Sequence, residues 1–307
     1  MESVLTPAQF DNSLLSMDLK QFELFRELIH RETGIWLRDG KEYMLASRLS
    51  RRLRHLGMSS FTEYYNYVEK SADGAREIGE LINCVTTNKT SFFRENHHFE
   101  FLSTKAVPEI QQAASHGGAR SVRIWSAACS TGQEPYSIAI SVLEALHGAR
   151  GAATSGTSLA PPAGWEIKLV ASDIDTTVLD TARRGVYGED ALADVSQALH
   201  KRYFLRGKGE MAGQVKIKPE LTHLIEFKRI NLNDRVWPVQ GPFDAIFFRN
   251  ALIYFNQKTQ ETFLRRMAHL LRPAGYLFLG HSEHIPWLHD VVTPLGHTVY
   301  QLRDAAP

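Results

Sequence analysis

The first part of the chain places apolar residues with the period of an α-helix. Over residues 19–84 they recur three and four positions apart, and no segment alternates as a strand does. This spacing predicts an all-helical N-terminal domain over residues 18–88, preceded by a flexible arm over residues 1–17. Asp39 followed by Glu42 is typical of a capping box and predicts that a helix begins there.

After about residue 120 the pattern changes to alternating strands and helices. Short apolar runs predict strands at Val122–Ser126, Ile167–Ser172, Ile225–Arg229, Ala245–Phe248, Tyr276–Leu279 and Thr298–Leu302. Amphipathic stretches between them predict helices at Gln133–Leu146, Thr177–Arg183 and Gln257–Leu270. Such alternation predicts an α/β domain over residues 89–307, built on a doubly wound, mostly parallel sheet.

Two segments interrupt this alternation. Residues 148–164 are rich in Gly, Ala, Ser and Pro without a period, which predicts a flexible surface loop. Residues 203–224 contain a Gly-rich turn followed by Val215–Lys218, which has the character of a short strand. We expect this segment to form a small antiparallel β flap inserted in the sheet domain.

The segment Ser126–Tyr136 carries the first chemical signal. An apolar strand ends at small residues, and a helical pattern then begins near Pro135. A second predicted strand ends at Asp173, and in folds of this kind such an acid holds ribose hydroxyls. Gly132 is the segment's glycine, so the G-x-G-x-x-G pattern of dinucleotide binders is absent. The two features together indicate a nucleotide-type cofactor site.

Composition narrows the class of protein without defining it. The 307 residues have a formal net charge of +1 and are 43% hydrophobic, as in ordinary soluble proteins, which gives no general attraction to nucleic acid. Two cysteines, Cys84 and Cys129, build no disulfide framework, and no Cys/His metal spacing is present. No leader pattern or bilayer-length apolar run occurs. We expect a cytoplasmic protein that is not membrane-embedded and binds no metal.

Five motifs follow one another along the chain: Thr86–Phe99, Ser126–Tyr136, Ser172–Asp175, Phe243–Tyr254 and Gly280–Glu283. With these motifs in this order, the chain resembles the CheR family of chemotaxis receptor methyltransferases, which use S-adenosylmethionine. The resemblance runs from about Phe22 to Leu302. The resemblance implies a Rossmann-like S-adenosylmethionine-dependent methyltransferase domain behind the helical domain. It implies methyl transfer to glutamate carboxylates of a chemoreceptor (a methyl-accepting chemotaxis protein), which forms glutamyl methyl esters in sensory adaptation.

The resemblance also implies roles for individual residues. Arg94 would grip and aim the acceptor carboxylate, because a guanidinium presents a planar fork of donors. Tyr254 matches a tyrosine placed close to the transferred methyl, and a buried structural tyrosine is the alternative. The residues implied at the cofactor are Asn88, Thr90, Arg94, Glu134, Asp173 (ribose), Asn231 and Leu232 (adenine), Arg249 and Asn250.

Partners are implied in the same way. Family members place a basic N-terminal helix against the acidic methylation region of the cytoplasmic part of the receptor; the matching residues are Arg48, Arg51, Arg52 and Arg54. A solvated helix face is the alternative. Some members also dock a C-terminal receptor peptide on the flap by strand addition. We expect a monomer without a nucleic-acid partner.

Other interpretations of single features remain open at this point. Asp173 could cap a helix, although Asp175 suits that position better. Arg94 and Glu95 could form a solvated charge pair, and His97 and His98 could pack beside the site as helix-start residues. For the whole chain, the alternatives are a small-molecule or nucleic-acid methyltransferase and a non-catalytic cofactor-binding adaptor.

Overall fold

The computed structural model describes residues 16–148 and 159–303 and divides the chain into two compact units. The first unit extends to Thr86 and the second begins at Thr87. Thr33–Ile35 belong to the second unit, where Ile35 forms an antiparallel bridge with Phe255. The units therefore divide two residues before the boundary expected from sequence. Most of the predicted arm and residues 149–158 of the predicted loop lie outside the described residues.

The first unit is helical, as predicted. Its helices are α1 (Leu19–Thr33), α2 (Glu42–Leu56), α3 (Phe61–Lys70) and α4 (Gly74–Val85). Phe25, Leu49 and Tyr64 have almost no exposed surface and form part of its core. The capping-box prediction is wrong: Lys41 precedes the helix without a side-chain cap, and Asp39 instead accepts a hydrogen bond from Arg26 at 2.7 Å. The Asp39 carboxylate, which the sequence pattern assigned to a helix cap, therefore pairs with Arg26 of α1 instead.

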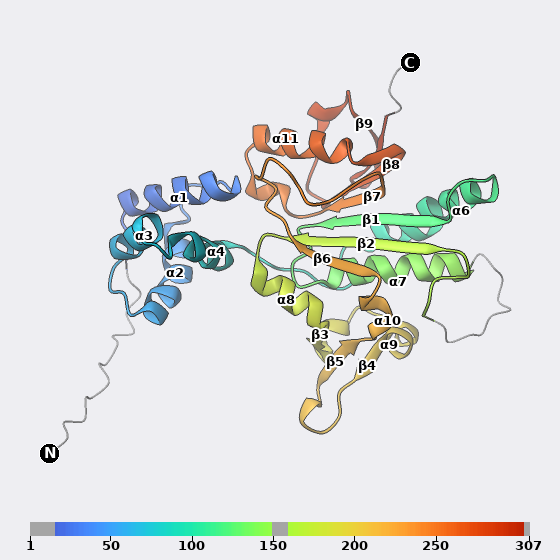
Figure 1. The fold of residues 1–307 in the computed structure, drawn as a ribbon, viewed down its shortest axis with the longest axis horizontal. Helices are drawn as coiled ribbons and strands as arrows, with labels where there is room; N and C mark the ends of the chain where they lie inside the picture. The colour runs from blue at the N-terminus through green and yellow to red at the C-terminus, as the bar shows by residue number, and fades with distance from the viewer. Residues whose placement is uncertain (1–15, 149–158, 304–307) are drawn as a thin grey trace. The chain divides into compact units, whose positions relative to one another are not determined.

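The second unit contains a seven-stranded sheet in the described part of the chain (Figure 1). The strand order is β6-β2-β1-β7-β8-β10-β9. The first five strands run parallel, and β10 is antiparallel to both of its neighbours. The bounds are β1 (Ser121–Ala127), β2 (Glu166–Asp173), β6 (Ile225–Arg229), β7 (Phe243–Phe248), β8 (Leu271–Leu279), β9 (Val292–Gly296) and β10 (Val299–Leu302). The predicted mostly parallel sheet is confirmed.

Successive residues of the central strands enter two different cores. Ile124 and Phe247 join one core, whereas Trp125 and Ile246 join the other. This two-faced burial explains why the strands read as continuous apolar runs. The first core also takes in residues of α5 (His97–Phe101), a π-helical turn η1 (Leu102–Ala106), α6 (Val107–Ser115), α7 (Gln133–Gly148) and α8 (Thr176–Arg184). The second core takes in α11 (Gln257–Ala268).

The predicted flap is a three-stranded antiparallel sheet, but it begins earlier than expected. Its order is β3-β5-β4, so β5 lies in the middle. The bounds are β3 (Val186–Gly188), β4 (Phe204–Arg206) and β5 (Gln214–Ile217). Strand β3 lies outside the predicted 203–224 segment. Its three residues are too few to show a strand pattern, and the strand with which it pairs, β5, follows much later in the chain.

Short helical elements complete the second unit. They are η2 (Glu189–Leu192), α9 (Gln197–Tyr203), η3 (Gly209–Met211), α10 (Pro219–Thr222), η4 (Leu252–Tyr254) and η5 (Pro286–Leu288). The turns after β1, β2, β7 and β8 carry four of the five sequence motifs. Because the carboxyl ends of parallel strands meet at one edge of a sheet, the fold brings those motifs together there.

Candidate functional site

The turn between β1 and α7 has an unusual backbone. Ala128, Ser130 and Gly132 have φ values of 61°, 51° and 96°. A Cβ on Gly132 would lie 2.8 Å from the Cβ of Ala182, so neither the dihedral nor the space admits a side chain. Residues other than glycine, such as Ala128 and Ser130, are strained in the left-handed conformation. Such strain is common where the backbone is shaped to bind a ligand.

Asp173 joins this turn to the end of β2. Its two carboxylate oxygens accept hydrogen bonds from the backbone N–H groups of Ser130, at 2.8 Å, and Asp175, at 3.0 Å. Burial raises the pKa of Asp173 to about 6, against the lowering effect of those hydrogen bonds. Asp175 caps α8 by accepting from Thr177 and Val178, as its position in the sequence suggested. Asp173 itself is therefore not the helix cap.

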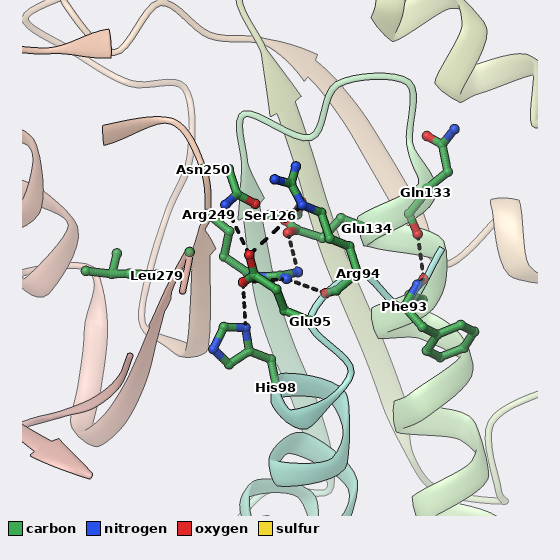
Figure 2. A network of polar contacts seen from close by, with 12 residues as sticks. Phe93, Arg94, Glu95, His98, Ser126, Gln133, Glu134, Arg249, Asn250 and Leu279 are labelled. Carbon is green, nitrogen blue, oxygen red and sulfur yellow. Dashed lines mark hydrogen bonds and ion pairs between the residues drawn. The ribbon is translucent and has the colours of Figure 1, made fainter. Parts of the chain in front are cut away.

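A buried network lies beside the turn, and Figure 2 shows its side chains converging from separate elements. The guanidinium of Arg249, which follows β7, has a side-chain exposure of 2%. It pairs with Glu95 Oε2 and Glu134 Oε2, each at 3.0 Å. Ser126 donates to the other oxygen of Glu134 at 2.7 Å. Arg249 thus fixes two carboxylates that come from distant parts of the sequence.

Glu95 has the largest number of partners in this network. Asn250 Nδ2 and His281 Nδ1 lie 3.2 and 3.0 Å from its Oε1, while the His281 backbone N–H donates to Oε2. Burial alone would raise the pKa of Glu95, but the charge of Arg249 and these hydrogen bonds lower it to about 2. Glu95 is therefore ionised at neutral pH. The alternative of a solvated Arg94–Glu95 pair is wrong, because Glu95 is only 11% exposed.

The pKa of Glu134 shifts in the opposite direction to that of Glu95. Its burial raises the pKa of the carboxyl group despite the nearby charge of Arg249 and the hydrogen bond from Ser126. For both Glu134 and Asp173, burial is the largest cause of the raised pKa, and a positive charge placed nearby would favour the ionised form. An acidic, buried site of this kind favours a ligand that carries positive charge.

Arg94 lies at the outer side of the network. Its side chain is 34% exposed, its Nη1 donates to Lys89 O at 2.9 Å, and its Nε lies 4.0 Å from Glu95 Oε1. Its own carbonyl oxygen accepts a hydrogen bond from Arg249. Phe93 and Glu95, on either side, have φ values of 52° and 57°. The backbone around Arg94 is thus held firmly, while its guanidinium remains accessible.

Asn88 and Thr90 come from the same segment as Arg94. The Asn88 amide donates to Asp175 Oδ2 at 2.8 Å, and its carbonyl oxygen accepts from Ser130 Oγ at 3.0 Å. Thr90 is half-buried. The structure therefore brings Asn88 to the turns that follow both β1 and β2.

Asn250 and Glu283 join the ends of β7 and β8. Asn250 has a φ of 57°, and its backbone N–H donates to Glu283 Oε2 at 2.9 Å. The same oxygen accepts from Gly280 at 2.7 Å. A Cβ on Gly280 would lie 2.4 Å from Asn250 Nδ2, so the two turns are in close contact.

Asn231 and Leu232 lie in the turn after β6, and both are half-buried. Trp237 Nε1 and Arg266 Nη1 donate to the carbonyl oxygen of Leu232 at 3.1 and 3.2 Å. The Arg266 guanidinium also stacks 3.7 Å from the centroid of the Trp237 ring. This pair, which the sequence did not single out, holds the Leu232 backbone in place.

Tyr254 ends the short helix η4 and is half-buried, so it is not the fully buried residue of the alternative interpretation. His97 and His98 begin α5, as one interpretation expected. Burial and the charge of Arg249 lower the pKa of His98 to about 4, so His98 is neutral at pH 7.

The four arginines of α2 differ in their surroundings within the helical unit. Arg48 donates to the carbonyl oxygens of Val85 and Thr86 at the end of α4. Arg52 forms a two-contact ion pair with the buried Glu77, at 2.8 and 2.6 Å. Arg51 and Arg54 are exposed. The helix therefore directs two arginines inward and leaves two on its surface.

Residues 16–148 and 159–303 contain neither a metal-binding cluster nor a membrane-spanning helix. No group of three or more His, Cys, Asp or Glu side chains there could hold a metal ion. No helix in those ranges is long and apolar enough to cross a membrane.

The site residues missed by sequence reasoning are Glu95, Ser126, His281 and Glu283. All four lie in recognised motifs, but no role in the site followed from that. Asn96, two histidines and a Phe follow Glu95, and they made a helix start visible but not the partners of the carboxylate. Those partners lie up to 186 positions away.

The donor set fits S-adenosylmethionine, which carries a sulfonium, an ammonium and ribose hydroxyls. Buried Asp173 and Glu134 supply anions with raised pKa values, and the left-handed turn at Gly132 lets the backbone approach a ligand closely. The fold and the site thus define a methyltransferase dependent on S-adenosylmethionine.

Comparison with known families agrees with this class. Residues 88–301 match the CheR methyltransferase, SAM binding domain, and residues 20–86 match the CheR methyltransferase, all-alpha domain. The chain belongs to the CheR family.

Two relatives extend this similarity over nearly the full length. Chemotaxis protein methyltransferase 2 of Pseudomonas aeruginosa is 45% identical over 95% of this chain and 96% of its own length. The chemotaxis protein methyltransferase of Escherichia coli is 42% identical over 94% of this chain and 92% of its own.

Proposed function

We propose that this chain transfers the methyl group of S-adenosylmethionine to glutamate side chains of a chemoreceptor in the cytoplasm, forming glutamyl methyl esters. The names of its relatives support a chemotaxis substrate. One observation carries the proposal: the accessible guanidinium of Arg94 lies beside a buried acidic cluster. The cluster suits a cationic cofactor, and the guanidinium suits an anionic acceptor.

The mechanism requires positioning rather than proton removal. The bound cofactor supplies a methyl group on a sulfonium, which is open to attack by a carboxylate oxygen. A glutamate with a pKa of about 4.3 is already ionised at neutral pH, so the chain needs no general base. Arg94 holds that carboxylate in line, and the constrained backbone at Phe93 and Glu95 fixes its direction. Tyr254 contributes a hydroxyl at the same edge.

We assign the remaining site residues to the cofactor. Asp173 receives the ribose hydroxyls, and Asn231 and Leu232 border the adenine. Asn88, Thr90, Glu134 and Asn250 line the rest of the site. Arg249 acts indirectly, because its two terminal nitrogens are occupied by Glu134, Glu95 and the Arg94 carbonyl. It positions those groups.

Receptor recognition is assigned to the surface of α2. Arg51 and Arg54 are exposed and available to an acidic partner, whereas Arg48 and Arg52 are engaged within the helical unit. The flap supports a second contact: β3 and β4 each pair only with β5 among the described strands, so a receptor peptide can add as a further strand. We propose that the protein acts as a monomer.

The experiment that tests the catalytic assignment replaces Arg94. In single turnovers at saturating S-adenosylmethionine, Arg94→Ala is expected to slow methyl transfer to receptor-rich membranes about 100-fold, because the acceptor carboxylate loses its orientation. Arg265→Ala, an exposed arginine paired with Glu261 and Asp290, is the matched control. Near wild-type transfer by Arg94→Ala would refute the assignment.

A further inference from the structure

The motif Gly280–Glu283 forms a tight turn directly after β8. The Glu283 N–H donates to Gly280 O at 2.8 Å, and Glu283 Oε2 accepts from the Gly280 N–H at 2.7 Å. The side chain of Glu283 therefore folds back over its own turn. The absence of a Cβ at Gly280 permits this, because a Cβ there would lie 2.9 Å from that oxygen.

The carboxylate of Glu283 also reaches the turn that follows β7. Its Oε2 accepts a hydrogen bond from the Asn250 N–H at 2.9 Å. Asn250 has a left-handed φ of 57°, which is strained for a residue other than glycine. A hydrogen bond to this N–H therefore helps to hold the strained backbone in place.

The same carboxylate lies at the start of η4, the short helix that ends at Tyr254. The first N–H groups of a helix have no carbonyl partner within it. Burial raises the pKa of Glu283, whereas hydrogen bonds from backbone N–H groups lower it, among them those of Leu252 and Ile253. These two residues begin η4. The carboxylate of Glu283 therefore contacts donors that the helix itself leaves free.

Burial makes these contacts strong constraints on the backbone. Glu283 is only 4% exposed. A buried carboxylate is costly unless hydrogen bonds satisfy it, and here N–H groups from two turns donate to it. Because β7 and β8 are neighbours in the sheet, Glu283 joins their carboxyl ends through one side chain.

The far end of η4 is held by a different residue. Gln260 Nε2, on α11, donates to Leu252 O at 2.8 Å and to Phe255 O at 3.0 Å. The backbone of Tyr254 thus lies between two fixed points. Glu283 fixes the chain before it, and Gln260 fixes the chain after it.

We propose that Glu283 is a positioning residue for methyl transfer, whose carboxylate fixes the segment Asn250–Tyr254 and thereby the direction of the Tyr254 hydroxyl. The proposal rests on the proposed function, because it takes Tyr254 as a residue that acts beside the transferred methyl. The contacts of Glu283 are with backbone N–H groups, so it acts through the segment that it holds.

Two replacements weaken this hold in different ways. Glu283→Gln keeps the length of the side chain but has one acceptor oxygen in place of two. Glu283→Asp keeps both oxygens but withdraws them from the Asn250 N–H by one methylene. Glu261→Gln is the matched control, because Glu261 lies on α11, pairs with Arg265 and has a side-chain exposure of 40%.

The first measurement is amide hydrogen exchange of the full-length protein, followed by mass spectrometry. In both Glu283 variants, peptides covering residues 249–255 should exchange about 10-fold faster, because their N–H groups lose acceptors. Peptides from β1 and β2 should exchange as in the wild-type protein. Unchanged exchange of residues 249–255, or an equal increase along the whole chain, would overturn the inference.

The second measurement is the single-turnover rate of methyl transfer to receptor-rich membranes at saturating S-adenosylmethionine. Glu283→Gln is expected to slow this rate about 10- to 100-fold, because the Tyr254 hydroxyl is misplaced. In a Tyr254→Phe background, the same replacement should slow the rate by less than about 3-fold more, since both changes affect one hydroxyl. Wild-type rates in both Glu283 variants, or losses that multiply in the double variant, would contradict the proposed role.

Failure of this inference can be told apart from failure of the proposed function. If the wild-type protein transfers methyl to the receptor and the Glu283 variants match it, the proposed function stands and the role of Glu283 fails. If the wild-type protein transfers none, the proposed function fails. The exchange of residues 249–255 then still shows whether Glu283 holds the segment.

Discussion

At the scale of single residues, Glu134 and Asp173 are buried near one edge of the sheet together with the guanidinium of Arg249, and the side chain of Glu95 beside them is 11% exposed. Their pKa values move in opposite directions. Glu95 is lowered to about 2, whereas burial raises Glu134 and brings Asp173 to about 6. Glu95 is therefore fixed in its charge, and Asp173 can change its charge near neutral pH.

This difference predicts a pH dependence of cofactor binding. As the pH falls through about 6, Asp173 gains a proton and its carboxylate no longer accepts two ribose hydroxyls as an anion. Affinity for S-adenosylhomocysteine should therefore fall on the acid side. Titration calorimetry between about pH 5 and pH 8 measures it.

Asp173→Asn provides the comparison. Its affinity should be lower at pH 8 and nearly independent of pH in the same range, because the titrating group is gone. A variant with the same acid-side decline as the wild-type protein would show that another group causes it.

The residue scale also shows where sequence reasoning ends. The turn Ser126–Tyr136 and the acid Asp173 could be predicted as parts of a cofactor site, because each directly follows or ends a predicted strand. The environment of Glu95 was not visible, because Arg249, Asn250 and His281 reach it only after folding. The residues within a few positions of Glu95 do not show whether its carboxylate is exposed to solvent or is held by several partners.

At the scale of elements, α11 supports the expected adenine turn. Arg266 donates to Leu232 O and stacks on Trp237, which donates to the same oxygen. Arg266→Ala removes one charge-assisted hydrogen bond and the stacking partner, so affinity for S-adenosylhomocysteine should drop about 10-fold. Calorimetry at pH 8 measures this change.

The neighbouring Arg265 is the control for this experiment. It lies on the same helix, pairs with Glu261 and Asp290, and does not contact the turn. Arg265→Ala should therefore keep wild-type affinity. Equal losses in both variants would indicate general destabilisation of α11 rather than a role at the adenine turn.

A second prediction at this scale concerns α2. Arg52 and Glu77 have side-chain exposures of 15% and 5%, and Tyr64 also donates to Glu77 at 2.8 Å. Arg52→Ala leaves a buried carboxylate without its counter-ion, so the free energy of unfolding should fall by about 3 kcal/mol. Urea denaturation followed by circular dichroism measures it.

Arg51 and Arg54, unlike Arg52, should matter for receptor binding and not for stability. Because both are exposed, replacing them with alanine should change the free energy of unfolding by less than about 0.5 kcal/mol. The double variant should weaken receptor binding, and the wild-type affinity should fall as salt rises. Receptor affinity that is independent of salt would contradict the assignment.

Some strands could be predicted from the sequence around them, and others could not. Strands β1, β2 and β7 were predicted, because β7 is buried at every position and β1 and β2 are buried on both faces over their last residues, which gives short apolar runs. Strands β3 and β4 have three residues each and depend on pairing with β5. Strand β9 is half-exposed at the sheet edge and contains Pro294, which weakens its signal.

At the scale of the whole molecule, the chain combines two units with separate tasks in the proposed function. The helical unit carries the exposed arginines of α2, and the sheet unit carries the site and the flap. The proposed acceptor is therefore recognised at more than one place. In the proposed function, the chemistry depends on the strand-end network around Arg249 and on the accessible Arg94.

The most direct measurement locates the methyl group after the reaction. The protein is incubated with S-adenosylmethionine and receptor-rich membranes, and the products are mapped by tandem mass spectrometry before and after mild base. We predict methyl esters on glutamates of the chemoreceptor that disappear in base and do not form with Arg94→Ala. Base-stable methylation, or methylation of another residue type or molecule, would contradict the account.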